Sequence, residues 1–362
     1  MRKIFLYINA INGGGAERVM VNLAQALAEQ GIDTTLVTSF RDSWEYPLDH
    51  RVHRISLEEE QLHQSRLRRN VGRIAKLRRL CRKEKPDLLL SFMAEPNFRA
   101  LMATRGLPVK TVVSVRNDPE REYAGKAGRL VGKRLLPLAD GCVFQTRDAK
   151  AWFPEKLQKK SAIIYNAVKP EFYEVQRAPV LGEIVTCGRL EEQKNHALLI
   201  EAFARMKAQH PEAILKIYGE GSLRPMLEQQ IAALGLTNRV LLMGTTNNVV
   251  AALRTASLFV LSSDYEGMPN ALMEAMAAGV PCVSTDCPCG GPRELFGPAL
   301  AEYLVPYGDA TALADAMRRA LIGPVEGTYF RQRAAAFAPD KVYGNWMRYL
   351  EQVVQGDPHN GN

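Results

Sequence analysis

Two cationic residues, Arg189 and Lys194, stand five positions apart in the stretch GRLEEQKN, which begins at Gly188. The stretch follows a short run rich in β-branched residues, so it is expected to form the loop at the end of a strand. An arginine can grip an oxyanion with two parallel hydrogen bonds and a lysine acts as a point charge, so both can reach one diphosphate. A solvated loop is the competing interpretation, because the motif is weak when it stands alone.

Two carboxylates, Glu266 and Glu274, are eight positions apart in the segment DYEGMPNALME at residues 264–274. Pro269 fits the first turn of a helix, which would direct the positive end of its dipole at a ligand. The residues around Glu274 are apolar on nearly every side, so this helix is expected to be buried and Glu274 to need a polar partner. Carboxylates accept hydrogen bonds from sugar and ribose hydroxyls, so we interpret the segment as a binding site rather than a surface helix.

Glycine-rich turns follow two other predicted strands. The first, NGGGAER at residues 12–18, opens a helix whose free N–H groups and dipole favour an anion, and its glycines permit positive φ. It matches neither GxGxxG nor GxxxxGK[ST], which disfavours a nicotinamide dinucleotide and a triphosphate loop. The second, Gly219-Glu220-Gly221, is interpreted as a place for a base or ribose. A plain turn is the alternative for both.

The elements that must position these turns alternate between short β-branched runs and longer helical patterns. This alternation predicts parallel sheets covered by helices on both faces, which bind ligands beyond the carboxyl ends of their strands. The pattern restarts after residue 170, so we expect an α/β chain of two Rossmann-like, doubly wound domains facing across a cleft. The domains are expected at residues 1–169 with about 341–362, and at residues 170–340.

The predicted strands are residues 4–8, 34–38, 87–92, 110–115, 140–144, 183–187, 214–218, 240–243, 258–262 and 281–284. The predicted helices that flank the motifs are residues 17–30, 196–209, 223–234, 249–255, 269–278 and about 341–354.

Composition excludes several classes of protein. With 46% hydrophobic and 24% charged residues over 362 positions, the chain resembles ordinary folded proteins rather than disordered ones. It has no run of about 18 apolar residues, and its start is better interpreted as a strand than as a secretory signal, so we expect a cytoplasmic protein. The cysteines are scattered apart from Cys287-Pro288-Cys289, and no histidine is near that cluster, so no metal site is expected.

Charge is distributed unevenly along the chain. Residues 1–170 hold 31 Lys and Arg against 18 Asp and Glu, a net +13, whereas residues 171–362 carry −5. Ten cations fall within residues 66–85, RLRRNVGRIAKLRRLCRKEK, where apolar residues recur at helical spacing from Leu67 through Val71 to Cys81. We expect an amphipathic helix whose cations meet an anionic membrane surface or a lipid diphosphate. A domain helix with a solvated face is the alternative, and no nucleic-acid-binding motif accompanies the charge. The cations expected to face the membrane are Arg68, Arg69, Arg78 and Arg79.

The motifs taken together, GGxER, GRLxxxKN, GEGxL and the E-x7-E segment with its EGMPN core, resemble those of the retaining nucleotide-sugar glycosyltransferases of the GT-B fold, family 4. The segments AGVPCV and GGPREL match the same family. The resemblance covers nearly the whole chain and is densest over residues 183–296. Within the family, the chain is most similar to bacterial enzymes that extend lipid-linked glycans for O-antigen, capsule, exopolysaccharide or protein glycosylation.

This resemblance implies a role for each matching residue. Arg189 and Lys194 would neutralise the donor diphosphate, Glu266 would hold the hydroxyls of the donor sugar, and Glu274 the ribose. The other donor-binding residues it implies are Gly14 and Gly15 at the phosphate, Gly219, Glu220, Gly221, Asn248 and Val249 around the base, and Gly188, Gly267, Met268, Pro269, Asn270, Ala271 and Leu272.

The implied reaction moves a hexose or N-acetylhexosamine from a nucleotide sugar, with UDP favoured, to a lipid-diphosphate-linked saccharide in bacterial surface-polysaccharide or glycan synthesis. The enzyme would be peripheral on the cytoplasmic face of the inner membrane. The chain lacks any Asp-x-Asp pair, so it is expected to need neither metal nor other cofactor. Without an obvious paired carboxylate nucleophile, retention suggests attack from the face that the diphosphate leaves, with the departing phosphate accepting the acceptor's proton.

One feature departs from the family pattern. Many relatives carry a histidine in the N-terminal domain, but none occurs here between His63 and His196. The comparable strand end is SVRND at residues 114–118, so Arg116 or Asn117 is expected to contact the sugar or the acceptor. The alternative activities are those of a GT-B-fold phosphorylase or a sugar-nucleotide epimerase, and a non-catalytic membrane-binding module is a third reading.

Overall fold

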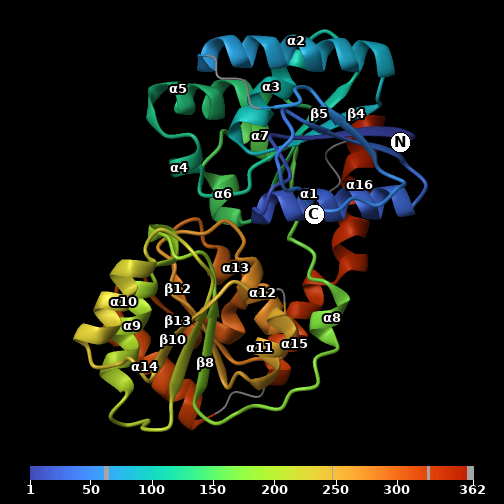
Figure 1. Cartoon of the computed structure of the whole chain (residues 1–362). Helices are drawn as coiled ribbons and strands as arrows, with labels where there is room; N and C mark the ends of the chain where they lie inside the picture. Colours follow the sequence, from blue (N-terminus) through green and yellow to red (C-terminus); the bar gives the residue numbers. More distant parts are fainter. Residues whose placement is uncertain (61–64, 247, 324–326, 357–362) are drawn as a thin grey trace. The chain divides into compact units, whose positions relative to one another are not determined.

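The computed structural model describes residues 1–60, 65–246, 248–323 and 327–356, without the side chain of Arg66. The chain divides into two compact units. Unit 1 comprises Met1–Asn166 with Asp340–Asn362, and unit 2 comprises Ala167–Pro339. Each unit is an α/β layer structure around one parallel sheet, which confirms the predicted fold class of two Rossmann-like domains (Figure 1).

The sheet of unit 1 has the strand order β3-β2-β1-β4-β5-β6-β7, and every pair within it is parallel. Strand β1 is central because it pairs with both β2 and β4, and the chain changes direction across the sheet at this point. The strands are β1 (Lys3–Ile8), β2 (Asp33–Thr38), β3 (His53–Ser56), β4 (Leu88–Phe92), β5 (Lys110–Ser114), β6 (Gly141–Phe144) and β7 (Ser161–Ile163).

Helices follow most of these strands, as the alternating pattern predicts. Those of unit 1 are α1 (Gly15–Glu29), α2 (Arg66–Glu84), α3 (Ala94–Thr104), α4 (Pro119–Glu122), α5 (Gly125–Leu130), α6 (Arg147–Ala151) and α7 (Glu155–Gln158), with most of α16 (Pro339–Gln355). Short π and 3₁₀ turns at Val131–Leu135 and Leu136–Leu138 complete it. The hydroxyl of Tyr349 in α16 accepts a hydrogen bond from the Cys142 N–H and lies within donating distance of the carbonyls of Cys142 in β6 and of Lys160, just before β7, so this last helix packs on unit 1.

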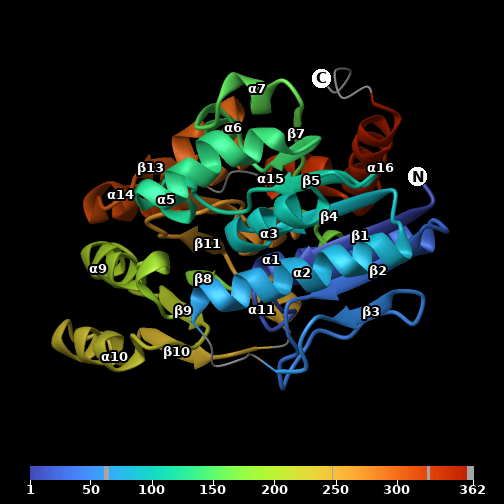
Figure 2. The ribbon, with the colours of Figure 1, turned by 90° about the horizontal axis from the view of Figure 1, so that it is seen from above.

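The basic helix α2 packs on one face of this sheet (Figure 2). Its residues Leu77 and Cys81 join Phe5, Val37 and Leu89 from β1, β2 and β4 in one buried cluster. Leu67 and Val71, expected to continue the same apolar stripe, are 75% and 60% exposed. The first two turns of α2 therefore carry apolar side chains that the unit does not cover.

The sheet of unit 2 has the order β10-β9-β8-β11-β12-β13, again with all pairs parallel. Its strands are β8 (Glu183–Cys187), β9 (Ile214–Tyr218), β10 (Val240–Gly244), β11 (Leu258–Leu261), β12 (Cys282–Asp286) and β13 (Leu304–Pro306). Its helices are α8 (Pro170–Tyr173), α9 (His196–Met206), α10 (Arg224–Ala233), α11 (Val249–Thr255), α12 (Asn270–Ala277), α13 (Gly291–Phe296), α14 (Ala310–Ile322) and α15 (Gly327–Ala334). Three 3₁₀ turns are at Glu192–Lys194, Pro298–Tyr303 and Ala335–Phe337.

Three short strands, β3, β7 and β13, were not predicted from the sequence. Each lies at a sheet edge, where one side of the strand needs no partner and a long β-branched run is not required. β13 ends in Pro306, a residue tolerated at an edge but not in a central strand. Among the described residues, no helix is both long and apolar enough to cross a lipid bilayer.

Candidate active site

The sequence motifs of unit 2 gather at the carboxyl edge of its sheet. The loop with Arg189 and Lys194 follows β8, and the loop with Glu266 follows β11, which pairs directly with β8. The chain reverses its order across the sheet between these two strands, the position where open α/β sheets bind ligands. Parallel pairing therefore brings together two motifs that are more than seventy positions apart.

Lys194 and Glu266 form a direct ion pair at this edge. The side chain of Lys194 is 17% exposed and that of Glu266 is 7% exposed, so the pair is largely withdrawn from water. Ser263 donates a second hydrogen bond to the same Glu266 carboxylate oxygen at 2.8 Å. Gln193 Nε2 donates a long hydrogen bond to the other oxygen, Oε2, at 3.5 Å. A carboxylate held in this way is fixed in position, and because each oxygen can accept more than one hydrogen bond, Oε2 can still accept one from a ligand hydroxyl.

Hydrogen bonds join the two loops on both sides of this pair. Asn195 Nδ2 donates to Asp264 Oδ1 at 2.8 Å, and the Asp264 N–H donates to the Gln193 carbonyl at 2.9 Å. The hydroxyl of Ser262 donates to the Lys194 carbonyl at 2.9 Å. The two loops thus form one preorganised surface, and the sequence analysis did not foresee these contacts.

Arg189 has a different setting from Lys194. Its side chain is exposed, and within the described residues it forms no ion pair. The sequence analysis treated the two cations alike, but the structure places one in a buried pair and leaves the other free to meet an anion from solvent.

His196, the first residue of α9, is a site residue that the sequence analysis missed. It is 3% exposed and lies against the backbone of Gly188 and Arg189. Burial, with the nearby charge of Lys194, lowers the pKa of His196 to about 4. The ring is therefore neutral at physiological pH and supports the loop without adding charge. Its position directly after the GRLxxxKN motif was the available signal.

The glycine pair after β9 approaches the β8 loop closely. Gly219 has φ of +146°, and a Cβ there would overlap the Gly188 carbonyl. A Cβ on Gly221 would likewise overlap the backbone of Leu190. Glycine is required at both positions because backbone packs against backbone. Glu220, between them, is half-exposed and pairs with Arg224 at 2.8 Å.

Glu274 lies on α12, which begins at Asn270 after the loop carrying Gly267 and Met268. At 8% exposure Glu274 is buried, as the apolar sequence around it predicts. It also lies near the end of β8, because its charge adds to burial in raising the pKa of Cys187 to about 12. Pro269 is the N-cap with extended backbone rather than a residue of the first turn, so that prediction was one position off. Ala271 and Leu272 follow in the first turn.

The remaining predicted base contacts follow β10, at the same edge. Asn248 caps α11 by accepting a hydrogen bond from the Ala251 N–H at 3.0 Å, and Val249 is the first residue of that helix. Asn248 is exposed and Val249 is half-buried. Capping thus already uses the carbonyl oxygen of Asn248.

In unit 1, the glycine turn opens α1 directly. Gly14 is the N-cap and Gly15 the first helical residue, two positions earlier than predicted. Only Gly13 of the three has a positive φ, at 75°. Gly14 instead leaves room for the Glu17 side chain, which a Cβ there would overlap.

Arg116 and Asn117 follow β5 at the carboxyl edge of the first sheet. Arg116 is 7% exposed, its guanidinium lies 4.4 Å from the centre of the Phe92 ring, and it donates to Asn166. Burial lowers the pKa of Arg116 to about 9. The Asn117 side chain accepts from the Asp118 N–H at 2.9 Å. Arg116 is therefore largely enclosed, with its Nε and Nη1 groups unpaired among the described residues, and a contact of Arg116 or Asn117 with the sugar or the acceptor stays a prediction.

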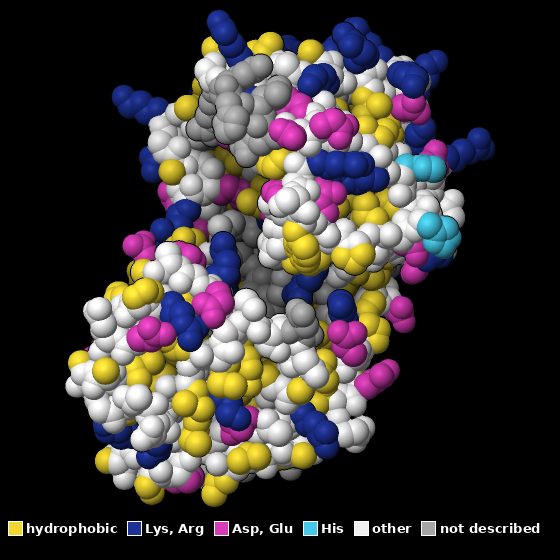
Figure 3. All heavy atoms as spheres, viewed as in Figure 1, with side chains coloured by type: hydrophobic (Ala, Val, Ile, Leu, Met, Phe, Trp, Pro, Cys, Tyr) yellow, Lys and Arg dark blue, Asp and Glu magenta, His cyan; other side chains and the backbone are white. Residues whose placement is uncertain are grey.

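The four cations expected to face a membrane differ in their surroundings. Arg68 and Arg79 are exposed, and Figure 3 shows Lys and Arg side chains gathered over the part of unit 1 where α2 lies. Arg69 is half-buried. Arg78 donates to the carbonyls of Ala103 and Arg105 at 2.8 and 2.7 Å, so it closes the end of α3 and is not a free cation. Arg73, on the same helix, forms a buried ion pair with Glu58 at 2.8 Å.

No group of three or more His, Cys, Asp or Glu side chains suited to a metal ion occurs within the described ranges. The cysteines of the Cys287-Pro288-Cys289 stretch are buried. Burial raises the pKa of the Cys287 thiol well above its ordinary value, so it stays protonated.

Two protein-family models match the chain. The model described as Glycosyltransferase Family 4 matches residues 13–172, and the model described as Glycosyl transferases group 1 matches residues 180–337. The two matches follow one another along the chain and fall on unit 1 and unit 2 respectively, with only residues 167–172 of the first match crossing the boundary.

The chain is also similar to other proteins over nearly its full length. The N-acetylgalactosamine-N,N'-diacetylbacillosaminyl-diphospho-undecaprenol 4-alpha-N-acetylgalactosaminyltransferase of Campylobacter jejuni is 28% identical, over 97% of this chain and 100% of the relative. The lipopolysaccharide core biosynthesis glycosyltransferase LpsE of Rhizobium meliloti is 26% identical over 92% of each chain. Among solved structures, Anabaena Alr3699/HepE in complex with UDP shares the fold with a TM-score of 0.79 at 18% identity, over 97% of this chain and 100% of that one.

Proposed function

Because the chain belongs to the glycosyltransferases built from a family 4 and a group 1 domain, we propose that it transfers a hexose or N-acetylhexosamine from a nucleotide sugar. UDP is the favoured nucleotide, and the acceptor is a saccharide carried on a lipid diphosphate during bacterial surface-polysaccharide or glycan synthesis. The name of the Campylobacter relative includes a diphospho-undecaprenol acceptor, that of LpsE places it in lipopolysaccharide core synthesis, and HepE was solved with UDP.

The buried pair of Lys194 and Glu266 is the observation that carries this proposal. Glu266 offers a fixed carboxylate for the hydroxyls of a donor sugar, and Lys194 places a cation beside that carboxylate. Their loops follow neighbouring strands and are joined by hydrogen bonds, so the geometry exists before substrate arrives. Preorganised charges of this kind stabilise a transition state more than flexible ones do.

Departure of the nucleoside diphosphate is the step in which negative charge builds up. Exposed Arg189 is placed to meet the phosphates with its planar fork of donors, and Lys194 supports it from the same loop. The amino end of α12 adds the positive end of its dipole at the same edge of the sheet. We propose that this cationic set replaces a metal ion, since the chain has no Asp-x-Asp pair.

Retention of configuration is proposed to follow from attack on the face that the diphosphate leaves. A double displacement needs a carboxylate free to attack the sugar, whereas Glu266 is committed to Lys194 and Ser263. The departing phosphate oxygen would then accept the proton of the acceptor hydroxyl. In this scheme Glu266 binds and orients the sugar and does not become covalently attached to it.

Because the proposed acceptor is linked to the membrane, the exposed surface of α2 is a candidate for membrane binding. Exposed Arg68 and Arg79 can meet anionic head groups, and exposed Leu67 and Val71 can enter the interface beside Arg68. We propose that the enzyme is peripheral on the cytoplasmic face of the inner membrane and uses the exposed residues of α2 to stay near its acceptor.

The decisive experiment incubates the purified chain with a set of nucleotide sugars and lipid-diphosphate-linked saccharides. We expect release of nucleoside diphosphate that depends on the acceptor, and a product whose new linkage has the donor's anomeric configuration by NMR. An inverted linkage would contradict the retaining mechanism. Turnover with inorganic phosphate in place of the acceptor would instead identify a phosphorylase, and interconversion of the donor sugar alone would identify an epimerase.

A further inference from the structure

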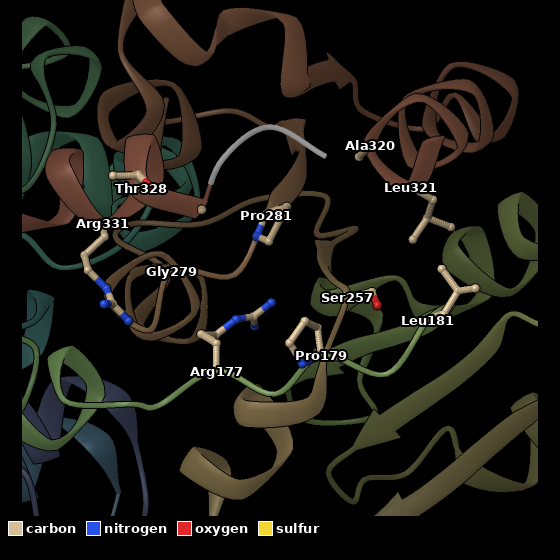
Figure 4. A pocket seen from close by; sticks show the side chains of 11 residues that line it. Arg177, Pro179, Leu181, Ser257, Gly279, Pro281, Ala320, Leu321, Thr328 and Arg331 are labelled. Carbon is tan, nitrogen blue, oxygen red and sulfur yellow. The ribbon is translucent and has the colours of Figure 1, made fainter. Parts of the chain in front are cut away.

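Unit 2 has a pocket at the opposite edge of its sheet from the motifs. It is lined by residues that precede strands, namely Leu181 before β8, Ser257 before β11 and Pro281 before β12, and by side chains from α14 and α15 (Figure 4). The motifs follow these same strands. Strand β8 is five residues long, so roughly 17 Å of strand, at about 3.3 Å per residue, separates the two edges. The pocket volume is about 610 Å³, within the usual range for small-molecule sites.

Two arginines, Arg177 and Arg331, line this pocket, and none of the other described residues that line it is an aspartate or a glutamate. Arg331 donates to the carbonyls of Ala277 and Ala278, where it closes the carboxyl end of α12. Arg177 uses Nη1 on the Leu253 carbonyl at 2.9 Å. Neither guanidinium forms an ion pair with a described residue, so among these residues two positive charges share the pocket without a balancing carboxylate.

The guanidinium of Arg177 has N–H groups that are not used in hydrogen bonds to the described residues. In Figure 4 its guanidinium points into the middle of the pocket, toward Pro281 and Ser257. With Nη1 engaged, its Nε and Nη2 groups have no partner among the described residues, and these are the donors that grip an oxyanion in parallel. Burial, and also the charge of Arg331, lower the pKa of Arg177, so a bound anion would offset the repulsion between the two guanidinium groups.

Apart from Ser257 and Thr328, the rest of the described lining is apolar. The larger apolar side chains are those of Pro179, Leu181, Pro281 and Leu321, and Leu181 is 75% exposed. Figure 4 shows the side chains of Leu181 and Leu321 together on the side away from Arg331. A ligand that complements both the Arg177 guanidinium and the apolar side chains has an anionic head group and a short apolar body.

We propose that this pocket binds a small amphipathic oxyanion, whose phosphate or carboxylate head pairs with Arg177 and whose apolar body packs on Pro179, Leu181 and Leu321. The site is separate from the motifs of the proposed donor site, and it stands whether or not the proposed transfer reaction is correct.

The test measures binding of four probes to the full chain by isothermal titration calorimetry: octyl phosphate, octanoate, octanol and inorganic phosphate. We expect at least one of the two anionic amphiphiles to bind, with the two arms identifying the preferred head group, and octanol and inorganic phosphate to bind at least about tenfold more weakly. Equal binding of octanol would overturn the anion recognition. Equal binding of inorganic phosphate would indicate an adventitious ion only, and the absence of binding by both amphiphiles would also overturn the proposal.

Variants locate the binding event. Arg177→Met should weaken amphiphile binding about tenfold or more, while Arg318→Met on the same unit should leave it unchanged. Because Arg177→Met also removes the bond to Leu253, Ala320→Trp provides a second route by filling the pocket from α14. Unchanged binding in a folded Arg177→Met or Ala320→Trp chain would refute the site. Lys194→Met should bind the amphiphile normally, which separates this result from any failure of the donor site.

Discussion

The carboxyl edges of the two sheets differ in whether their buried charged side chains form an ion pair. In unit 2, Lys194 and Glu266 meet in a direct ion pair between loops of neighbouring strands. In unit 1, Arg116 and Glu122 are both buried, yet they form no ion pair in the part of the chain that the structure describes. Arg116 is held instead by an aromatic ring and amide groups.

Burial shifts the pKa of one titratable group at each of these edges. It raises the pKa of Glu122 to about 7, against the opposing influence of nearby backbone N–H groups and of Arg116. In unit 2, burial lowers the pKa of His196 to about 4. In unit 1, burial therefore favours the protonated, neutral form of the Glu122 carboxyl. In unit 2, burial favours the deprotonated, neutral form of the His196 imidazole. The edge of unit 2, with its ion pair, is suited to holding fixed charges near a substrate. The edge of unit 1, with its unpaired carboxyl, is expected to be sensitive to pH.

The largest effect should come from removing either member of the pair in unit 2. Lys194→Met and Glu266→Gln should each reduce kcat on the order of 10²- to 10³-fold, because each deletes a preorganised charge at the reacting centre. The measurement is nucleoside diphosphate release at saturating acceptor. Glu201→Gln, which breaks the half-exposed pair with Arg205 on α9, is the matched control and should leave kcat unchanged. Full activity in both site variants, with folding verified, would refute the assigned roles.

The next largest effect concerns stability in acid. His196 has a folded pKa of about 4 against 6.5 when unfolded, so the unfolded chain binds more protons between these values. As pH falls from 6.5 to 4, His196 should remove up to about 3 kcal/mol of the free energy of unfolding. Denaturant titrations of wild type and His196→Leu at several pH values measure this. Exposed His50→Gln is the control, and parallel pH curves for His196→Leu and wild type would contradict the prediction.

Glu122 should produce the opposite slope. Its folded pKa is raised, so its contribution to stability is fully present below about 4.5 and declines as pH rises through 7. Glu122→Gln should flatten this decline, which the same titrations would detect between pH 5 and about 8. A steeper decline in the variant would show that a charged Glu122 is the stabilising form, and would remove the contrast between the two edges.

A smaller effect is expected from the surface of unit 1. Neutralising Arg68 and Arg79 together should weaken binding to anionic vesicles about thirtyfold, since each well-placed cation contributes about 1 kcal/mol. Flotation with phosphatidylglycerol vesicles measures the change. The control makes the same change in charge on unit 2 with Arg254→Gln and Arg319→Gln. Equal losses in both double variants would show that net charge alone drives binding.

The smallest effect should follow removal of divalent metal. If Arg189, Lys194 and the α12 terminus supply the positive charge, activity should be the same in excess EDTA and in millimolar Mg²⁺. A loss on chelation that Mg²⁺ restores would show that unit 2 does not supply this charge by itself.

Much of the fold follows from local sequence. Repeated β-branched runs separated by helical patterns indicated two parallel sheets, and strands such as β8 and β9 have the predicted bounds. The edge strands were not predictable, because a strand paired on one side needs little hydrophobic patterning. Leu67 and Val71 illustrate a related limit, since helical spacing predicts a common face but not how far the sheet beneath it extends.

The sequence by itself determined which residues stand at the strand ends of unit 2, because the motifs there are contiguous and each follows a recognisable strand. Only the tertiary structure decided that Lys194 meets Glu266, that His196 is buried beside them, and that Arg116 is enclosed rather than open. Strand pairing across the switch point sets the first of these contacts, and packing density sets the other two. Such contacts join residues far apart in the chain, where neither spacing nor composition constrains distance.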